Sequence, residues 1–220
     1  MMLESSAYIS LIIQLLVGVV DLWGISINIP NNKNIFKDLL KLELGVQVVE
    51  FAFYLWMVLN ITTVKNITPY RYLDWFITTP TMLLTLMIFL SKDQETYNGI
   101  VQFISDNKDD VIKVGLSNVL MLVFGLLGEY QYINNTLAVG LGFIPFVYYY
   151  KKIYDKNITE ESTTYQKGFF WFFFIVWSVY GLAALLPYIP KNVLLNILDL
   201  FSKNLIGLIL VYIIYKNKLD

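Results

Sequence analysis

Long hydrophobic runs alternate with short polar connectors from one end of the sequence to the other. A hydrocarbon core about 30 Å thick is spanned by about 20 apolar residues in an α-helix. Seven runs reach or approach that length, and they cover residues 8–29, 39–62, 70–90, 111–128, 132–150, 168–188 and 193–215. With their connectors they use nearly the whole chain. The pattern therefore predicts an all-α membrane protein, a seven-transmembrane-helix bundle in which residues 1–220 form a single domain.

Composition supports a membrane protein and removes several other classes. Hydrophobic residues make up 57% of the 220 positions and charged residues 15%, whereas soluble domains average about 45–50% and about 25%. The net charge of −1 provides no positive field for nucleic acid. The sequence contains no Cys and no His, which excludes disulfides and thiolate metal sites and removes the usual general base. We therefore expect no enzyme and no nucleic-acid partner, and we assign no metal site.

Cationic residues predict the orientation of the bundle. Most of the 16 Lys and Arg residues fall in or directly beside the connectors and the tail of one side, namely Lys33, Lys37, Lys41, Lys92, Lys108, Lys113, Lys151, Lys152, Lys156, Lys167, Lys216 and Lys218. The connectors of the other side carry Lys65 and Lys191. Because cytoplasmic loops of membrane proteins are enriched in Lys and Arg, this asymmetry predicts an N-terminus outside and a C-terminus in the cytoplasm.

Ionisable side chains inside the predicted spans are costly and are therefore functional candidates. Asp199 and Lys203 are four residues apart on one helix face, and Arg71 and Asp74 are neighbours on another helix. One interpretation is a set of salt bridges that hold the bundle together. Alternatively, a desolvated amine favours its neutral form and can form a Schiff base with an aldehyde, and the acids would then serve as counterions. Asp21 fits either an ion path or a pair with an interfacial lysine.

Aromatic residues are concentrated in the sixth hydrophobic run. Residues 169–174 are all Phe or Trp, and Trp177 and Tyr180 follow three residues apart on one face. Such side chains in membrane helices commonly face lipid or pack in the core. Trp177 and Tyr180 could instead enclose a flat, apolar polyene.

Two segments resemble those of the microbial (type 1) rhodopsins. Residues 71–80 read RYLDWFITTP and residues 199–203 read DLFSK, and the likeness extends over all seven runs in order. The resemblance implies that Lys203 carries all-trans retinal as a Schiff base, with Asp74 as the first counterion and Asp199 as the second. It further implies a retinal pocket lined by Trp75, Thr79, Met121, Trp177 and Tyr180, an Asn118 that pairs with Thr79, a Tyr54 that hydrogen-bonds the second counterion, and an Arg71 that organises the outer half.

Some positions depart from the pattern of the proton-pumping members of that family. The position at which those pumps carry a proton-donating acid holds Thr85, whose hydroxyl cannot donate a proton at a useful pKa. Gly181 and Ala184 stand where the family usually has a proline and a second tryptophan. These departures predict slow reprotonation of the Schiff base, and they weaken the interpretation as a pump.

A polar stripe runs along the second hydrophobic run. Glu43, Gln47, Glu50 and Tyr54 follow at helical spacing on one face, over about 16 Å at about 1.5 Å per residue. The stripe is unfavourable against lipid and is expected to face the interior of the bundle. In one interpretation Glu43 only marks the end of the helix and Glu50 is a single buried acid. In the other, the stripe lines a hydrated cation pathway.

The resemblance is greatest to the rhodopsins of large DNA viruses of algae and other protists. Channelrhodopsins have a constriction that matches Ser10, Glu50 and Asn204 in this sequence. This places the chain near the channelrhodopsin-like viral subgroup, which conducts monovalent cations and is suppressed by external calcium. The resemblance implies the membrane of a virus-infected protist cell as the location, and oligomers are common in the family.

We therefore expect a retinal-binding photoreceptor that acts as a light-gated cation channel, with protons and monovalent cations as permeating ions. Ser10, Glu43, Gln47, Glu50, Asn204 and Arg71 would form the ion pathway. An outward proton pump remains an alternative, with Asp74 as acceptor and Glu43 as donor. A sensory rhodopsin, or a seven-helix scaffold or solute carrier without chromophore, also stays open.

Overall fold

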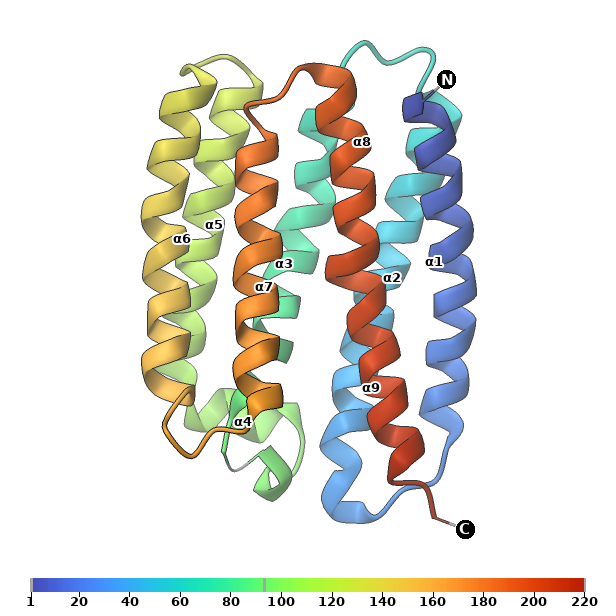
Figure 1. Cartoon of the computed structure of the whole chain (residues 1–220), viewed down its shortest axis with the longest axis vertical. Helices are drawn as coiled ribbons and strands as arrows, with labels where there is room; N and C mark the ends of the chain where they lie inside the picture. Colours follow the sequence, from blue (N-terminus) through green and yellow to red (C-terminus); the bar gives the residue numbers. More distant parts are fainter. Residues whose placement is uncertain (1, 93, 220) are drawn as a thin grey trace.

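The computed structural model describes residues 2–92 and 94–219, and these residues form helices and connecting loops without a β-strand. Figure 1 shows long helices standing side by side. In chain order the elements are α1 (Met2–Ser26), η1 (Asn31–Lys33), α2 (Asn34–Asn60), α3 (Thr68–Leu90), η2 (Gln94–Thr96), α4 (Ile100–Asp106), α5 (Lys108–Glu129), α6 (Asn135–Asn157), α7 (Thr164–Ala183), α8 (Tyr188–Asp199), η3 (Leu200–Asn204) and α9 (Leu205–Lys216). The prediction of an all-α bundle is confirmed.

The long helices form seven rods, because α8, η3 and α9 continue one another as a single rod (Figure 1). The N-terminus and the C-terminus lie at opposite ends of the bundle. We call the half that carries the N-terminus the N-side and the half that carries the C-terminus the C-side. The short helix α4 lies at the C-side end, in a connector for which the hydrophobic pattern predicted no helix.

Five rods are long and apolar enough to cross a membrane by length and hydropathy alone: α1, the rod from η1 through α2, α3, α5, and the rod from α8 through α9. Of the other two rods, α6 is rich in Tyr, and α7 contains Tyr and Trp. Aromatic side chains with a polar edge lower a hydropathy average although they are well suited to membrane interfaces. The two remaining rods therefore complete the bundle with a weaker hydropathy signal.

Proline sets the connection between α7 and α8. The expected span 168–188 ends earlier, at Ala183, and the last rod begins at Tyr188 rather than at residue 193. Pro187 stands at the N-cap of α8 in an extended backbone conformation, with φ −56° and ψ 155°. Proline lacks the N–H that a helix interior needs but is compatible with the start of a helix. The chain therefore turns before Pro187 and starts a new helix after it.

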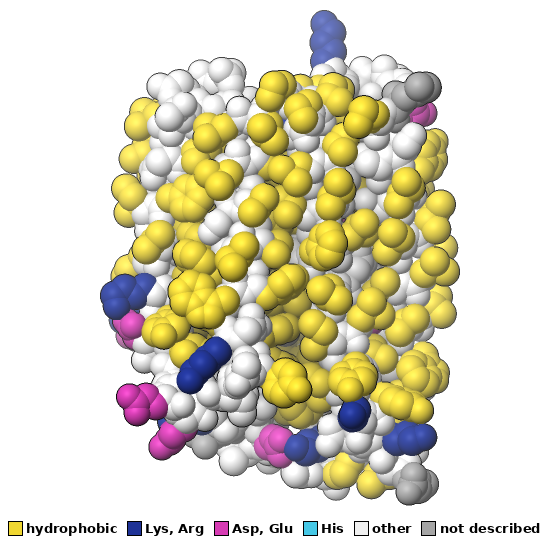
Figure 2. All heavy atoms as spheres, viewed as in Figure 1, with side chains coloured by type: hydrophobic (Ala, Val, Ile, Leu, Met, Phe, Trp, Pro, Cys, Tyr) yellow, Lys and Arg dark blue, Asp and Glu magenta, His cyan; other side chains and the backbone are white. Residues whose placement is uncertain are grey.

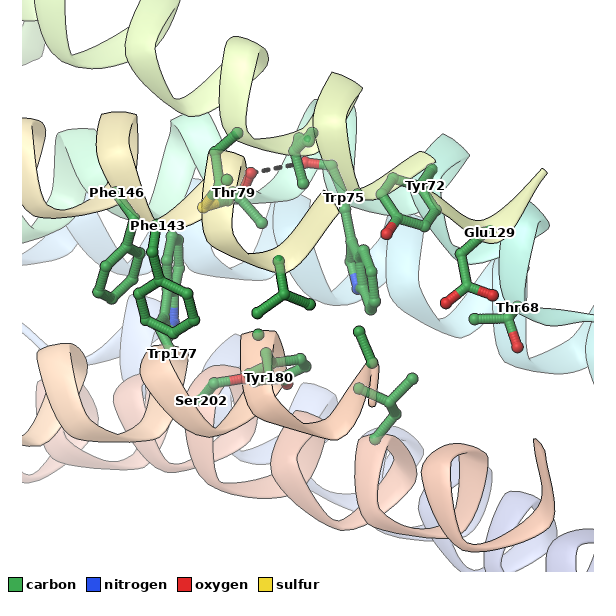
Figure 3. A pocket seen from close by; sticks show the side chains of 18 of the residues that line it. Thr68, Tyr72, Trp75, Thr79, Glu129, Phe143, Phe146, Trp177, Tyr180 and Ser202 are labelled. Carbon is green, nitrogen blue, oxygen red and sulfur yellow. Dashed lines mark hydrogen bonds between the residues drawn. The ribbon is translucent and has the colours of Figure 1, made fainter. Parts of the chain in front are cut away.

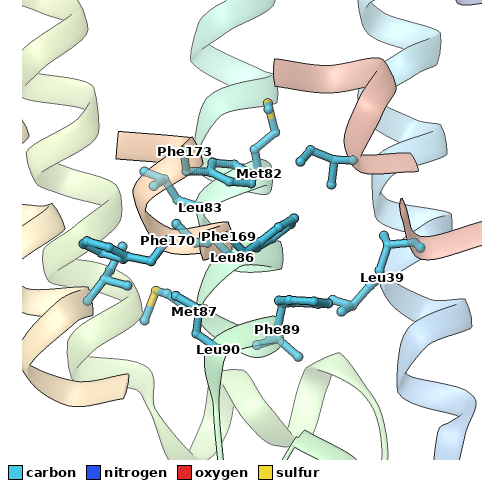
Figure 4. Close-up of a cluster of buried hydrophobic side chains, with 14 of the residues drawn as sticks. Leu39, Met82, Leu83, Leu86, Met87, Phe89, Leu90, Phe169, Phe170 and Phe173 are labelled. Carbon is cyan, nitrogen blue, oxygen red and sulfur yellow. The ribbon is translucent and has the colours of Figure 1, made fainter. Parts of the chain in front are cut away.

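The surface and the core divide the side chains by type. Figure 2 shows a broad hydrophobic belt, with charged side chains gathered mainly near the C-side end. Inside the C-side, α3 and α7 pack through Met82, Leu83, Leu86, Phe169 and Phe173 (Figure 4). This apolar cluster fixes α3 against α7, and the buried polar residues Asp21, Glu43 and Gln47 lie outside it, on α1 and α2.

Candidate functional site

Lys203 lies at the centre of the bundle among three carboxylates. Its Nζ donates a hydrogen bond to Asp74 Oδ2 at 2.6 Å and lies 3.6 Å from both Asp199 Oδ1 and Glu50 Oε1. All four side chains are buried. A buried amine of this kind requires nearby negative charge, and the three acids supply it from α2, α3 and α8. The sequence placed two of these acids beside Lys203; Glu50 is the third.

The backbone around Lys203 departs from an ordinary α-helix. Lys203 belongs to η3, a π-helical turn in which the N–H of Leu205 bonds to the carbonyl of Leu200. Such turns occur mostly as single insertions in α-helices and frequently at functional sites. The wider turn lies between α8, which carries Asp199, and α9. It sets the direction in which Lys203 leaves the rod.

Asp199 is held by hydroxyl and guanidinium donors. Tyr54 Oη donates to Asp199 Oδ2 at 2.6 Å, and Tyr180 Oη donates to Asp199 Oδ1 at 2.7 Å. Arg71 Nη1 lies 3.3 Å from Asp199 Oδ2. Ser202 is 2.7 Å from Tyr180 Oη. The structure thus brings Tyr54 to Asp199, as the resemblance implied, and adds Tyr180 as a second donor.

Arg71 connects this centre to the N-side. Its guanidinium donates to Asn192 Oδ1 at 3.0 Å and to Asn196 Oδ1. Asn192 donates onward to Thr68 at 2.9 Å, and Asn196 to Ser6 at 2.8 Å. The two asparagines were not predicted as site residues, although a signal was present. Asn192, Asn196, Asp199 and Lys203 follow at i, i+4, i+7 and i+11, the spacing of a polar stripe on one helix face.

An apolar pocket leads away from Lys203. Trp75, Trp177 and Tyr180 line it together with Met121 and Phe143 (Figure 3). Trp75 and Tyr180 meet edge to face with centroids 5.9 Å apart. At the N-side end of the pocket, Lys191 donates to both carboxylate oxygens of Glu129 at 2.8 and 2.9 Å.

The residues of this pocket fit a long, flat, apolar group attached to Lys203. The amine in the structure stands for the nitrogen that would carry such a group, and Lys203 itself lines the pocket. Gly181 is necessary for the pocket wall, because a Cβ there would lie 2.9 Å from the ring of Phe143. Asn118 donates to Thr79 Oγ1 at 2.7 Å, and Thr79 donates to the carbonyl of Trp75 at 2.8 Å. These bonds fix the position of the Trp75 segment beside the pocket.

The residues expected to form the ion pathway divide into two groups. Ser10 donates to the backbone carbonyl of Asn196 at 3.2 Å, so it is hydrogen-bonded to α8 rather than to Glu50 or Asn204. The expected constriction is therefore not closed by hydrogen bonds among its three members. Glu43, Gln47, Glu50 and Asn204 are buried, and their side-chain oxygens make no hydrogen bond with the described part of the chain.

The chain matches the family model described as bacteriorhodopsin-like protein over residues 2–217, and it belongs to that family. It is an integral membrane protein with the seven-helix fold of the microbial rhodopsins. Members of the family normally bind retinal through a Schiff base to a lysine, and they are photoreceptors or ion transporters rather than typical enzymes. The predicted resemblance is confirmed.

Solved structures agree with this assignment. The viral rhodopsin OLPVRII superposes with a TM-score of 0.83 at 25% sequence identity, over 98% of this chain and 99% of that chain. Blue light-absorbing proteorhodopsin from Med12 gives a TM-score of 0.76 at 20% identity, over 97% of each chain. The proton pumping rhodopsin AR2 from the marine alga Acetabularia acetabulum gives 0.74 at 18%, over 98% and 95%. The last two share the fold. Among curated proteins no sequence match was found.

Proposed function

We propose that this protein is a light-gated cation channel whose chromophore is all-trans retinal bound to Lys203. When bound, retinal supplies the absorption of visible light and a light-driven change of shape. The support for its attachment is the position of Lys203, which lines an apolar pocket between Trp75 and Trp177 and has three carboxylates near its Nζ. The acids on α2, α3 and α8 would hold a positive charge at Nζ in the dark.

Proton transfer from Nζ is the first step that these residues would perform. Asp74 is the best-placed acceptor, because its Oδ2 lies 2.6 Å from Nζ while Asp199 lies 3.6 Å away. Asp199 is also occupied by Tyr54, Tyr180 and Arg71. Loss of the charge at Nζ would remove the attraction on Glu50, whose carboxylate makes no hydrogen bond that would otherwise hold it in place. Glu50 would then be free to rearrange.

The observation that carries the channel hypothesis is the set of buried, unbonded polar side chains beside Lys203. Glu50, Gln47 and Glu43 follow one face of α2 toward the C-side, and Asn204 lies next to Lys203 on η3. Buried polar groups cost free energy unless they are solvated or paired. In a membrane protein, such groups mark water-filled or ion-conducting paths. Acidic and amide oxygens would favour cations over anions.

The charge distribution supports the expected orientation in the membrane. Lysines of the connectors gather near the C-side end (Figure 2), which would place the C-side in the cytoplasm. The proposed location is a host cell membrane. Inhibition by external calcium and assembly into oligomers stay predictions.

The chromophore and the current can be tested separately. The purified protein supplied with all-trans retinal should gain visible absorbance, and Lys203→Ala should remain colourless. In retinal-supplied cells, light should evoke a current whose size changes in Glu50→Gln while the absorbance of that variant persists. A coloured protein that gives no current under any gradient would contradict the channel and leave the retinal site intact.

An outward proton pump is a second candidate, because Glu43 is a buried acid on the C-side and could return a proton toward Lys203. Vesicles without any ion gradient distinguish the two functions. A pump would build a light-dependent pH difference across the vesicle membrane, and Glu43→Gln would slow it. A channel would build none, since it only dissipates existing gradients.

A further inference from the structure

Asp21 of α1 is a buried acid for which the proposed function has no role. Its side chain is 0% exposed, and neither carboxylate oxygen makes a hydrogen bond within the described residues. An isolated carboxylate inside a membrane protein is costly and normally has an ion, a proton or water as partner. The surroundings of Asp21 indicate which of these it is built to hold.

Gly207 of α9 brings the helix backbone directly against this carboxylate. A Cβ at Gly207 would lie 2.6 Å from Asp21 Oδ2 and 2.8 Å from Oδ1. A side chain at position 207 would occupy the space of the Asp21 carboxylate. The carboxylate can lie there because residue 207 is a glycine. Gly207 is one helical turn beyond Lys203, and Asp21 therefore lies close to the chromophore lysine along the rod.

Further side-chain oxygen atoms face the same region from α2. Glu43 is 1% exposed, lies within electrostatic range of Asp21, and has two unbonded oxygens. The side-chain amide of Gln47 is equally buried and unbonded, and its Oε1 faces Gly18, which lies one turn before Asp21 on α1. Carboxylate and amide oxygens are hard ligands that suit alkali and alkaline-earth cations.

An apolar seal closes the region toward the C-side end. Gly24 lies one turn beyond Asp21, and a Cβ there would be 2.7 Å from Val211 and 2.9 Å from Leu40. Both of these side chains are buried. Close packing of α1, α2 and α9 at this level leaves the acid on the inner side of a tight hydrophobic contact. A cation at Asp21 would be retained behind this contact until the helices move.

We propose that Asp21 and Glu43, with the amide of Gln47, form a binding site for one partly hydrated monovalent cation between Lys203 and the Gly24–Leu40–Val211 seal. This proposal rests on the proposed function, and it gives the channel an ion-binding site in the C-side half of its conduction path. A monovalent ion is favoured because the site supplies two carboxylates and one amide, whereas Ca²⁺ takes about six to eight oxygen ligands.

Cation binding can be measured in the dark, without any photocurrent. The carboxyl-stretch region of the infrared spectrum of the retinal-loaded protein should change when K⁺ or Na⁺ replaces N-methyl-D-glucamine at constant pH and ionic strength. Asp21→Asn should remove that change while the visible absorbance persists. A spectrum that responds to pH but to neither cation would show that the two acids share a proton, and it would overturn the site.

The photocurrent supplies the second test, with a steric variant and its matched control. Gly207→Ala should lower the light-evoked cation current several-fold, because the added methyl displaces the Asp21 carboxylate. Gly45→Ala on α2 should leave the current unchanged, since a Cβ there meets no atom within 4 Å. Equal currents in both variants and in Asp21→Asn would contradict the site. Absence of current in the unmodified protein would instead contradict the proposed function, and the infrared result would still decide the site.

Discussion

The two halves of the bundle treat their buried polar side chains in opposite ways. On the N-side, Arg71 is bonded to Asn192, Asn196 and Asp199, and these partners are bonded in turn to Thr68, Ser6 and Tyr54. On the C-side, the side-chain oxygens of Gln14, Asp21, Glu43, Gln47 and Thr85 make no hydrogen bond within the part of the chain that the structure describes. Except for the half-buried Ser6, the side chains of both sets are buried.

Buried polar side chains that lack hydrogen bonds have different consequences for the protein from those that are fully hydrogen-bonded. A satisfied network of buried polar groups makes a unique, rigid arrangement, whereas unsatisfied groups need water or ions. The N-side network is therefore expected to be rigid and closed to ions. The C-side is expected to admit water or ions. Lys203 lies between them, so that a change of charge at Nζ acts on both halves.

Removal of the central cation of the N-side should have the largest effect on stability. Arg71→Gln leaves Asp199 without its guanidinium partner, and loss of one member of a buried ion pair costs about 3–5 kcal/mol. Thermal loss of helicity in detergent measures the change. Glu43→Gln is the matched C-side variant and should cost much less, because Glu43 has no bonded partner to lose. Equal losses would contradict the contrast between the halves.

Loss of a side-chain amide should lower the free energy of unfolding more on the N-side than on the C-side. Asn196→Leu removes the bonds to Arg71 and Ser6, and buried groups left unsatisfied cost about 1–3 kcal/mol each. Gln47→Leu removes a buried amide that makes no hydrogen bond among the described residues, and it should leave the free energy of unfolding unchanged or raise it. Chemical denaturation of both variants tests the difference, and a larger loss in Gln47→Leu would argue that Gln47 has partners of its own.

Substitutions at two glycines of the C-side should change the free energy of unfolding by a smaller amount. Gly24→Ala places a methyl against Val211 and Leu40 and should destabilise by about 1 kcal/mol through overpacking. Gly45→Ala has open space around its Cβ and should stabilise by up to about 1 kcal/mol through higher helix propensity. Melting temperatures of the two variants should therefore move in opposite directions. A Gly24→Ala variant that melts at or above the unmodified protein would show that no tight seal exists there.

Much of the fold follows from the hydrophobic pattern, because a membrane demands long apolar helices whose number can be counted. The same logic identified Asp74, Asp199 and Lys203, since charges within a span are rare. Asn192 and Asn196 were missed because neutral amides do not interrupt a hydrophobic run as charges do. The π-turn at Leu200–Asn204 leaves no signal in a period of 3.6 residues. The end of α7 before Pro187 was set by backbone chemistry that an apolar run conceals.

The reversal potential of the light-evoked current tests the central claim most directly. Illuminated, retinal-supplied cells are held at a series of voltages while the K⁺ and Na⁺ gradients are changed. A conducting C-side predicts a current that changes sign at a voltage that follows the cation gradient. A current that keeps one direction at every voltage and under every gradient would contradict it.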